Sequence, residues 1–116
     1  MLNCIDLFCG CGGLSLGFEK AGINVLVGID AWKDAITTFN YNHKNSKGIC
    51  ADLSTLNPEE IEKELNCKTV DLIIGGPPCQ GFSVAGKRIV DDERNKLYKN
   101  FVRFVEYYKP KAFMME

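Results

Sequence analysis

The sequence predicts an α/β fold in which a mostly parallel, Rossmann-like sheet is covered by helices on both faces. Short apolar, β-rich segments alternate along the chain with segments whose apolar residues recur at helical spacing. Several of the short segments end at a glycine cluster or a carboxylate, as strands do at a ligand-binding edge. No internal repeat, low-complexity tract or linker interrupts the sequence, so we expect one domain over residues 1–116.

Residues 3–8 predict the first strand, because this short apolar run is closed by a cluster of glycines, Gly10, Gly12 and Gly13. Residues 14–21 then carry apolar side chains at helical spacing, and Gly22 can end that helix. The order is therefore a strand, a tight turn and a helix.

The next segments predict two further strands around a second helix. NVLVGID at residues 24–30 is β-rich and ends on a carboxylate, and residues 32–39 show the next helical stripe. The polar stretch at residues 40–46 predicts a loop. Residues 48–51 predict a short third strand that leads to Asp52.

The second half of the chain continues the alternation. Residues 58–65 open with Pro-Glu-Glu, which predicts a helix start, and residues 70–74 predict a fourth strand. The Gly-Gly-Pro-Pro run at residues 75–78 stops that strand. Residues 97–108 predict an amphipathic helix, and the apolar residues 112–115 predict a fifth strand.

Charge and composition limit the functional classes. The net charge is -1 and the pI about 5.8, so a nucleic-acid partner would need basic residues from elsewhere. The chain has no basic leader and no apolar run near the ~20 residues of a membrane span, so we expect a cytoplasmic protein without membrane contact. Six cysteines without a C-x-x-C pair, and a single histidine, predict reduced thiols and no metal site.

Chemically useful residues follow each predicted strand, where ligands of open α/β sheets bind. A glycine turn followed about 20 residues later by an acid, here Asp30, suits a ligand that carries a ribose. The spacing is not the dinucleotide fingerprint, because Ser15 stands at its third glycine position, and this weakens a nicotinamide interpretation. A tight turn without any ligand is the alternative.

The segment GGPPCQGFS at residues 75–83 is the most informative of the chain. Cys79 follows two prolines, so a stiff backbone holds its thiol at the active edge, as a nucleophile requires. The alternative is a buried, unreactive thiol. We keep that interpretation for the other cysteines, Cys4, Cys9, Cys11, Cys50 and Cys67.

Two motifs resemble those of a known family. DLFCGCGG at residues 6–13 and GGPPCQGFS at 75–83 resemble the first and fourth signature motifs of DNA cytosine-5 methyltransferases, and FMME at 113–116 is similar to the start of the next. The resemblance implies an S-adenosylmethionine-dependent methyltransferase sheet that is truncated after about its fifth strand, with the target-recognition region absent. The family's bacterial modification methylases fit best.

The resemblance also implies a binding site for S-adenosylmethionine. Phe8 would stack on the adenine, Asp30 would bind the ribose, and Asp52 would bind the adenine amino group. The glycine turn of Gly10, Gly12 and Gly13 would pass the methionine end. Trp32 is either a second wall of the adenine pocket or a core residue. Two further residues complete the implied cofactor-binding set, Leu53 and Pro78.

The reaction implied by the resemblance is covalent. The Cys79 thiolate would attack C6 of a cytosine flipped out of double-stranded DNA, while Glu116 contacts N3, so that C5 can accept the methyl group. Without the resemblance, Glu116 would be interpreted as a solvent-exposed carboxylate. The implied nucleic-acid contacts are Gln80, Ser83, Lys87, Arg88 and Arg94, and a solvated charged loop at residues 84–94 is their alternative.

Other classes remain open from the sequence. The chain could be a non-catalytic S-adenosylmethionine-binding piece of a split enzyme, or part of a transfer-RNA cytosine-5 methyltransferase. A nicotinamide dehydrogenase is disfavoured by the glycine spacing. Because later family motifs do not occur in these residues, we expect the chain to be inactive on DNA without a C-terminal part or a partner chain.

Overall fold

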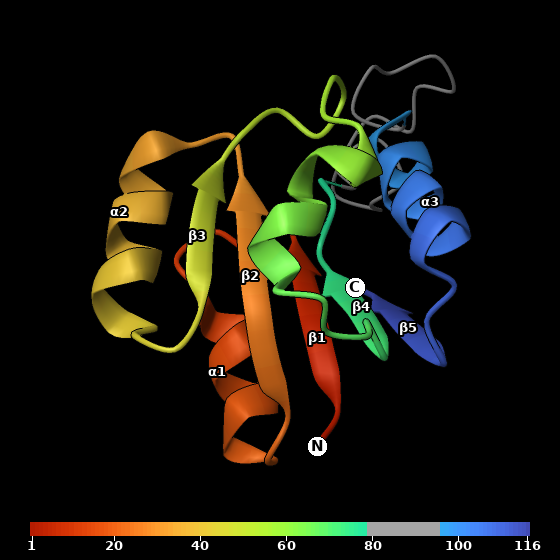
Figure 1. Cartoon of the computed structure of the whole chain (residues 1–116). Coiled ribbons are helices and arrows are strands. Elements are labelled where there is room, and N and C mark those ends of the chain that lie inside the picture. The colour runs from red at the N-terminus through yellow and green to blue at the C-terminus, as the bar shows by residue number, and fades with distance from the viewer. Residues whose placement is uncertain (79–95) are drawn as a thin grey trace.

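A computed structural model describes residues 1–78 and 96–116 of the protein (Figure 1). A five-stranded sheet runs through them in the order β3-β2-β1-β4-β5, and every pair of neighbours is parallel. The strands are β1 (Asn3–Leu7), β2 (Asn24–Asp30), β3 (Lys47–Cys50), β4 (Leu72–Gly75) and β5 (Ala112–Met115). The predicted α/β, Rossmann-like fold is confirmed, and the described sheet is parallel throughout.

Helices cover both faces of this sheet, as predicted. The 3-10 helix η1 (Pro58–Leu65) and α3 (Leu97–Tyr108) pack on one face, and α1 (Gly13–Lys20) and α2 (Lys33–Asn42) pack on the other. Side chains alternate along β1 accordingly, because Ile5 joins the core beneath η1 and α3 whereas Cys4 packs with Phe18 of α1.

The larger core cluster lies between the sheet and the pair η1 and α3. Phe101 and Phe104 of α3 are fully buried there against apolar residues of the three central strands. Removing such side chains from water is the main favourable term in folding. The remaining members of this cluster are Ile5, Leu7, Val27, Ile29, Leu53, Ile61, Leu65, Val70 and Ile73.

One predicted loop is partly helical. The prediction of a loop from residue 40 is wrong for residues 40–42, because α2 continues to Asn42. Phe39 and His43 flank this turn and are 0% and 5% exposed, whereas residues 40–42 are exposed. Their polarity therefore marks the outer side of a helix and not its end.

Two other elements differ in detail from the predictions. Residues 58–65 are helical as predicted but in 3-10 geometry, and a capping box between Asn57 and Glu60 opens the helix. The fourth strand begins at Leu72 instead of residue 70. Asp71, the residue before this strand, accepts a hydrogen bond from the N–H of Asn3 at 2.8 Å and forms an ion pair with Lys111 at 3.3 Å.

The strand order places a binding crevice at one edge of the sheet. The chain crosses from β1 outward to β2 and β3, and then returns to add β4 and β5 on the other side of β1. Connections leave β1 and β4 in opposite directions, which opens a crevice at their carboxyl ends. All five strands run upward in Figure 1, so this edge lies at the top of the view.

Candidate functional site

The turn after β1 has a backbone that few residues adopt. Phe8 has a φ of 57°, and Gly10 and Gly12 have φ of 56° and 97°. A left-handed φ is rare for an aromatic residue and persists only where the surroundings impose it. Here the N–H of Cys9 donates to the carbonyl of Ile29 and the N–H of Gly12 to the carbonyl of Cys9, both at 3.0 Å. The turn is therefore fixed from both sides.

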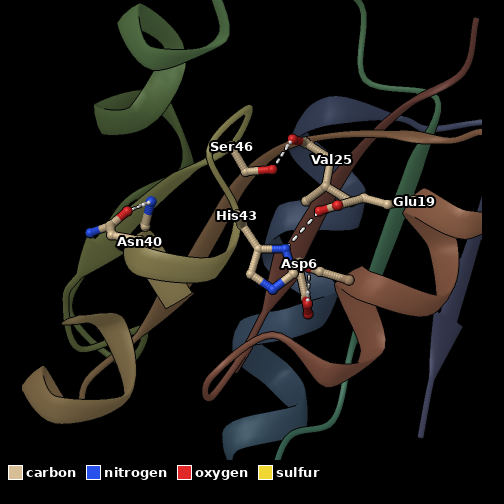
Figure 2. A network of polar contacts seen from close by, with 8 residues as sticks. Asp6, Glu19, Val25, Asn40, His43 and Ser46 are labelled. Carbon is tan, nitrogen blue, oxygen red and sulfur yellow. Dashed lines mark hydrogen bonds and ion pairs between the residues drawn. The ribbon is translucent and has the colours of Figure 1, made fainter. Parts of the chain in front are cut away.

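The single histidine of the chain lies beneath this turn. A Cβ added at Gly12 would lie 2.2 Å from Nε2 of His43, so only glycine fits there. His43 stacks on Phe39 with 4.5 Å between ring centroids, and its Nδ1 lies 2.8 Å from Oε1 of Glu19 (Figure 2). The ring thus joins α2 to α1 under the glycine turn, a role that the sequence did not reveal because Glu19 is 24 residues away.

Asp30, at the end of β2, is held against the glycine turn. Its Oδ2 accepts the N–H of Gly10 at 2.9 Å, and its Oδ1 accepts the N–H of Trp32 at 2.9 Å. Each carboxylate oxygen has a further lone pair that can accept a hydrogen bond from a hydroxyl group. The predicted ribose acid is therefore oriented by backbone donors on both sides of it.

Asp52 follows β3 and opens a compact turn. Its Oδ1 accepts the hydroxyl of Ser54 at 2.7 Å and the N–H of Ser54 at 2.9 Å. These two hydrogen bonds hold the pKa of Asp52 below its ordinary value, so the group is a carboxylate at neutral pH. Leu53 beside it is 3% exposed and belongs to the core.

Most of the predicted cofactor-binding side chains line one cavity at the carboxyl edge of the sheet. It has a volume of about 240 Å³ and extends from the end of β1 to α3. Its lining contains the predicted residues Phe8, Asp30, Asp52, Leu53 and Pro78, together with Ala31, Ala51, Gly76 and Leu97.

A second cavity of about 400 Å³ adjoins the first. The two cavities share Phe8, Gly76 and Pro78, so they meet at these residues. Glu116, the predicted catalytic acid, lines only the second cavity. Its other lining residues are Asp6, Cys9, Leu14 and Pro77.

Asp6 is a candidate that sequence reasoning missed. It is 1% exposed, and its Oδ2 accepts the hydroxyl of Ser15 at 2.5 Å while its Oδ1 has no hydrogen-bond partner within the described residues. Burial raises the pKa of Asp6 to about 6. Asp6 lines the larger cavity as a buried carboxylate, and such a group favours a ligand that brings a positive charge near it.

Glu116 and the Pro-Pro segment lie close together. The N–H of Glu116 donates to the carbonyl of Gly75 at 2.9 Å, and a Cβ added at Gly76 would lie 3.9 Å from Oε2 of Glu116. Pro78, which precedes the predicted nucleophile Cys79, lines both cavities. Cys79 itself lies outside the described residues, as do Gln80, Ser83, Lys87, Arg88 and Arg94.

Other predicted residues lie beside the cavities without lining them. Trp32 is 67% exposed, so its interpretation as a core residue is wrong, and neither lining includes its side chain. Gly10, Gly12 and Gly13 also stay outside both linings. Gly10 reaches the site through its bond to Asp30, and Gly13 begins α1.

The expectation of buried, unreactive thiols holds for only two of the described cysteines. Cys4 and Cys9 are buried, and burial raises the pKa of Cys4 to about 12 and that of Cys9 even further. The expectation is wrong for the exposed thiols, which lie in the glycine turn, at the end of the edge strand β3 and in the left-handed turn after η1; these are Cys11, Cys50 and Cys67.

Residues 1–78 and 96–116 offer neither a cluster of metal ligands nor a membrane-spanning helix. These residues contain no group of three or more His, Cys, Asp or Glu side chains placed to hold a metal ion. None of their helices has the length and apolar character that a membrane span requires.

The chain is similar in sequence to a family of DNA methylases and to several curated relatives. The family model described as C-5 cytosine-specific DNA methylase matches residues 2–116. The Type II methyltransferase M.DdeI of Desulfomicrobium norvegicum is 47% identical over 115 residues, which are 99% of this chain and 27% of that protein. Type II methyltransferase M.HgiGI of Herpetosiphon aurantiacus is 40% identical, and the match covers 99% of this chain and 89% of that protein.

A solved structure agrees with the sequence matches. A prophage-encoded protein of E. coli, described as a DNA modification methyltransferase, superposes with a TM-score of 0.85 at 43% identity, over 99% of this chain and 31% of that one. The chain thus spans about a third of that structure, and between 27% and 37% of the first six curated relatives that it matches.

Proposed function

The chain belongs to the family of C-5 cytosine-specific DNA methylases. We therefore propose that it provides the methyl-donor site and the nucleophile of a DNA cytosine-5 methyltransferase in a restriction-modification system. S-adenosylmethionine is the proposed donor, and double-stranded DNA with a target cytosine is the proposed substrate. The observation that carries the proposal is the pair of adjoining cavities beside the segment that leads to Cys79.

The residues of the two cavities fit this donor. The smaller cavity offers Phe8 as an aromatic surface for adenine, with the carboxylates of Asp30 and Asp52 as acceptors for the ribose hydroxyls and the adenine amino group. The larger cavity would take the methionine end, where the buried carboxylate of Asp6 would favour a positive charge. Because both cavities border Phe8, a single elongated molecule can occupy them together.

The proposed chemistry begins with the thiolate of Cys79. Its attack on C6 forms a carbon–sulfur bond and pushes electrons toward C5, while Glu116 hydrogen-bonds or protonates N3. When bound, S-adenosylmethionine supplies the methyl group from its sulfonium to that electron-rich C5. A base then removes the C5 proton, the electrons of that bond expel the thiolate of Cys79, and any proton on N3 returns to Glu116. The base releases the C5 proton to water, and the enzyme is then in its starting state.

Glu116 would lie in the wall of the cavity that a flipped cytosine must enter. Its side chain lines the larger cavity, which also contains Pro77 and Pro78, the residues directly before the nucleophile. This role is supported by the closeness of Glu116 to the Pro-Pro segment in the lining of one cavity. The roles of Gln80, Ser83, Lys87, Arg88 and Arg94 in DNA contact stay predictions.

We further propose that residues 1–116 act as one S-adenosylmethionine-binding domain, and that DNA methylation requires target recognition by other residues. The first six curated relatives are roughly three to four times as long as the match, and the net charge of -1 gives this chain no overall electrostatic attraction for the DNA backbone. The additional residues can belong to the same polypeptide or to a partner chain. Methylation of DNA by the 116-residue chain alone would contradict this part of the proposal.

A trapping experiment tests the nucleophile. The chain, supplied with the residues that its relatives carry beyond the match, is incubated with S-adenosylmethionine and a duplex that contains 5-fluorocytosine. Fluorine cannot leave as a proton does, so a covalent complex should accumulate with Cys79 present and disappear in Cys79→Ser. Cys67→Ser is the control, because that thiol is exposed and belongs to neither cavity. Equal trapping by Cys79→Ser would remove this thiol from the mechanism.

A further inference from the structure

Arg103 of α3 hydrogen-bonds to two backbone carbonyls that are far from it in the sequence. Its Nη2 donates to the carbonyl of Leu56 at 2.6 Å and to the carbonyl of Leu53 at 3.2 Å, across 47 and 50 residues of sequence. Both acceptors belong to the turn that follows β3. A single guanidinium group therefore holds two points of that turn against α3.

The tied turn is one wall of the smaller cavity. Asp52 and Leu53 line that cavity from the turn, and Leu97 lines it from the first residue of α3. Arg103 lies on the same helix as Leu97, so its two hydrogen bonds connect the elements that form opposite parts of the lining. The two bonds of Arg103 add a directional contact to the apolar packing of Leu53 in the core, which has no preferred direction of its own.

The turn is also ordered around the carboxylate of Asp52. The carbonyl of Asp52 accepts the N–H groups of Thr55 at 3.1 Å and Leu56 at 2.9 Å, while its Oδ1 accepts both donors of Ser54. The carbonyls of Leu53 and Leu56 that Arg103 binds therefore belong to the same small hydrogen-bonded unit as the carboxylate. A shift of these carbonyls would move the Asp52 side chain with them.

We propose that Arg103 is the positioning residue that sets the selectivity of the donor site for adenine. This proposal rests on the proposed function, because it assumes that Asp52 accepts a hydrogen bond from the exocyclic amino group of the bound adenine. Arg103 holds the turn so that this carboxylate reaches a donor on the base and discriminates against a base with a carbonyl at that position. Such discrimination is strong only where the acceptor is fixed, because a mobile acceptor can turn away from the mismatch.

A binding experiment tests the proposal on the same preparation that traps the fluorinated duplex. Dissociation constants are measured for S-adenosylhomocysteine and for S-inosylhomocysteine, in which a carbonyl replaces the amino group. The unmodified protein should prefer the adenine ligand. Arg103→Met keeps an unbranched side chain but removes the guanidinium donors, and it should reduce that preference by about tenfold. Arg103→Lys keeps a charged donor and should restore part of it.

Tyr108→Phe is the matched control. The Tyr108 hydroxyl donates to the carbonyl of Pro58 at 2.5 Å, so it also connects α3 to the segment after β3, but neither residue lines either of the two cavities described above. Tyr108→Phe should lower the melting temperature and leave the ratio of the two dissociation constants unchanged. This control separates a general loss of stability from a change in the adenine pocket.

The outcomes are distinguishable. If the unmodified protein binds neither ligand, the proposed function itself fails. If it prefers the adenine ligand and Arg103→Met keeps the full preference, Arg103 has no part in selectivity, whatever its effect on stability. An equal loss of preference in Tyr108→Phe would likewise overturn the proposal, because the effect would then follow from loosening α3 at either position.

Discussion

The buried carboxylate of Asp6 predicts a specific dependence of stability on pH. Its pKa is about 6 in the folded protein, against 3.8 as the ordinary value, chiefly because burial disfavours the charged form. The folded state therefore holds this proton more tightly than the unfolded state does. The resulting stabilisation is fully present below pH 3.8 and is lost as the pH rises through about 6.

The size of this effect follows from the two pKa values. At about 1.4 kcal/mol per pKa unit, the interval between 3.8 and about 6 corresponds to roughly 3 kcal/mol of unfolding free energy, of which about 2 kcal/mol falls between pH 4 and pH 8. Asp6→Asn removes the titrating group at almost constant shape. The unfolding free energy of Asp6→Asn relative to the unmodified protein should therefore rise by about 2 kcal/mol over that range.

Urea unfolding of both proteins at several pH values measures this difference. Asp71→Asn is the control, because the N–H of Asn3 holds the pKa of Asp71 below its ordinary value, so this carboxylate stabilises the fold at neutral pH and that contribution is lost on acidification. The two variants remove the same charge and should show opposite pH trends. A difference between Asp6→Asn and the unmodified protein that stays constant from pH 4 to pH 8 would refute the reasoning.

Three further predictions concern packing and thiol exposure. Gly12→Ala should cost about 2 kcal/mol or more of unfolding free energy and weaken S-adenosylhomocysteine binding measured by calorimetry, because its methyl group meets His43 at 2.2 Å. Phe101→Ala should cost about 3–5 kcal/mol in urea unfolding, since this fully buried ring leaves a cavity. A thiol reagent followed by mass spectrometry should leave Cys4 and Cys9 unmodified in the folded protein and modify the exposed thiols Cys11, Cys50 and Cys67. Native-state labelling of Cys4 as fast as that of Cys67 would contradict the burial of Cys4.

The positions of the strands and helices could be predicted because they depend on local patterns. Alternation between β-rich runs and helical stripes located every described strand within about two residues, and the Pro-Glu-Glu start located η1. The end of α2 was missed, because what extends the helix is the burial of His43 against Glu19 and Gly12, which are far from it in the sequence. The order of the strands depends on long-range pairing, which no local pattern contains.

Part of the candidate site could be predicted for the same reason. Asp30 ends one strand and Asp52 comes two residues after another. Because parallel strands bring their carboxyl ends to one edge, strand prediction alone places these acids near the glycine turn. Asp6 lies inside a strand among apolar neighbours, and nothing local indicates whether its side chain faces solvent or α1. Only the contact with Ser15 of α1 shows that it is buried in a cavity wall.

Arg103 marks the limit of prediction from the sequence. An arginine among polar residues of an amphipathic helix is expected to face solvent, and its acceptors here are backbone carbonyls about 50 residues away, which any residue type supplies. Side-chain-to-side-chain pairs leave a signal in residue identity, whereas bonds to the backbone do not. For a site built on strand ends, the acids can therefore be found from the sequence, but the groups that hold the supporting turns in place must come from the structure.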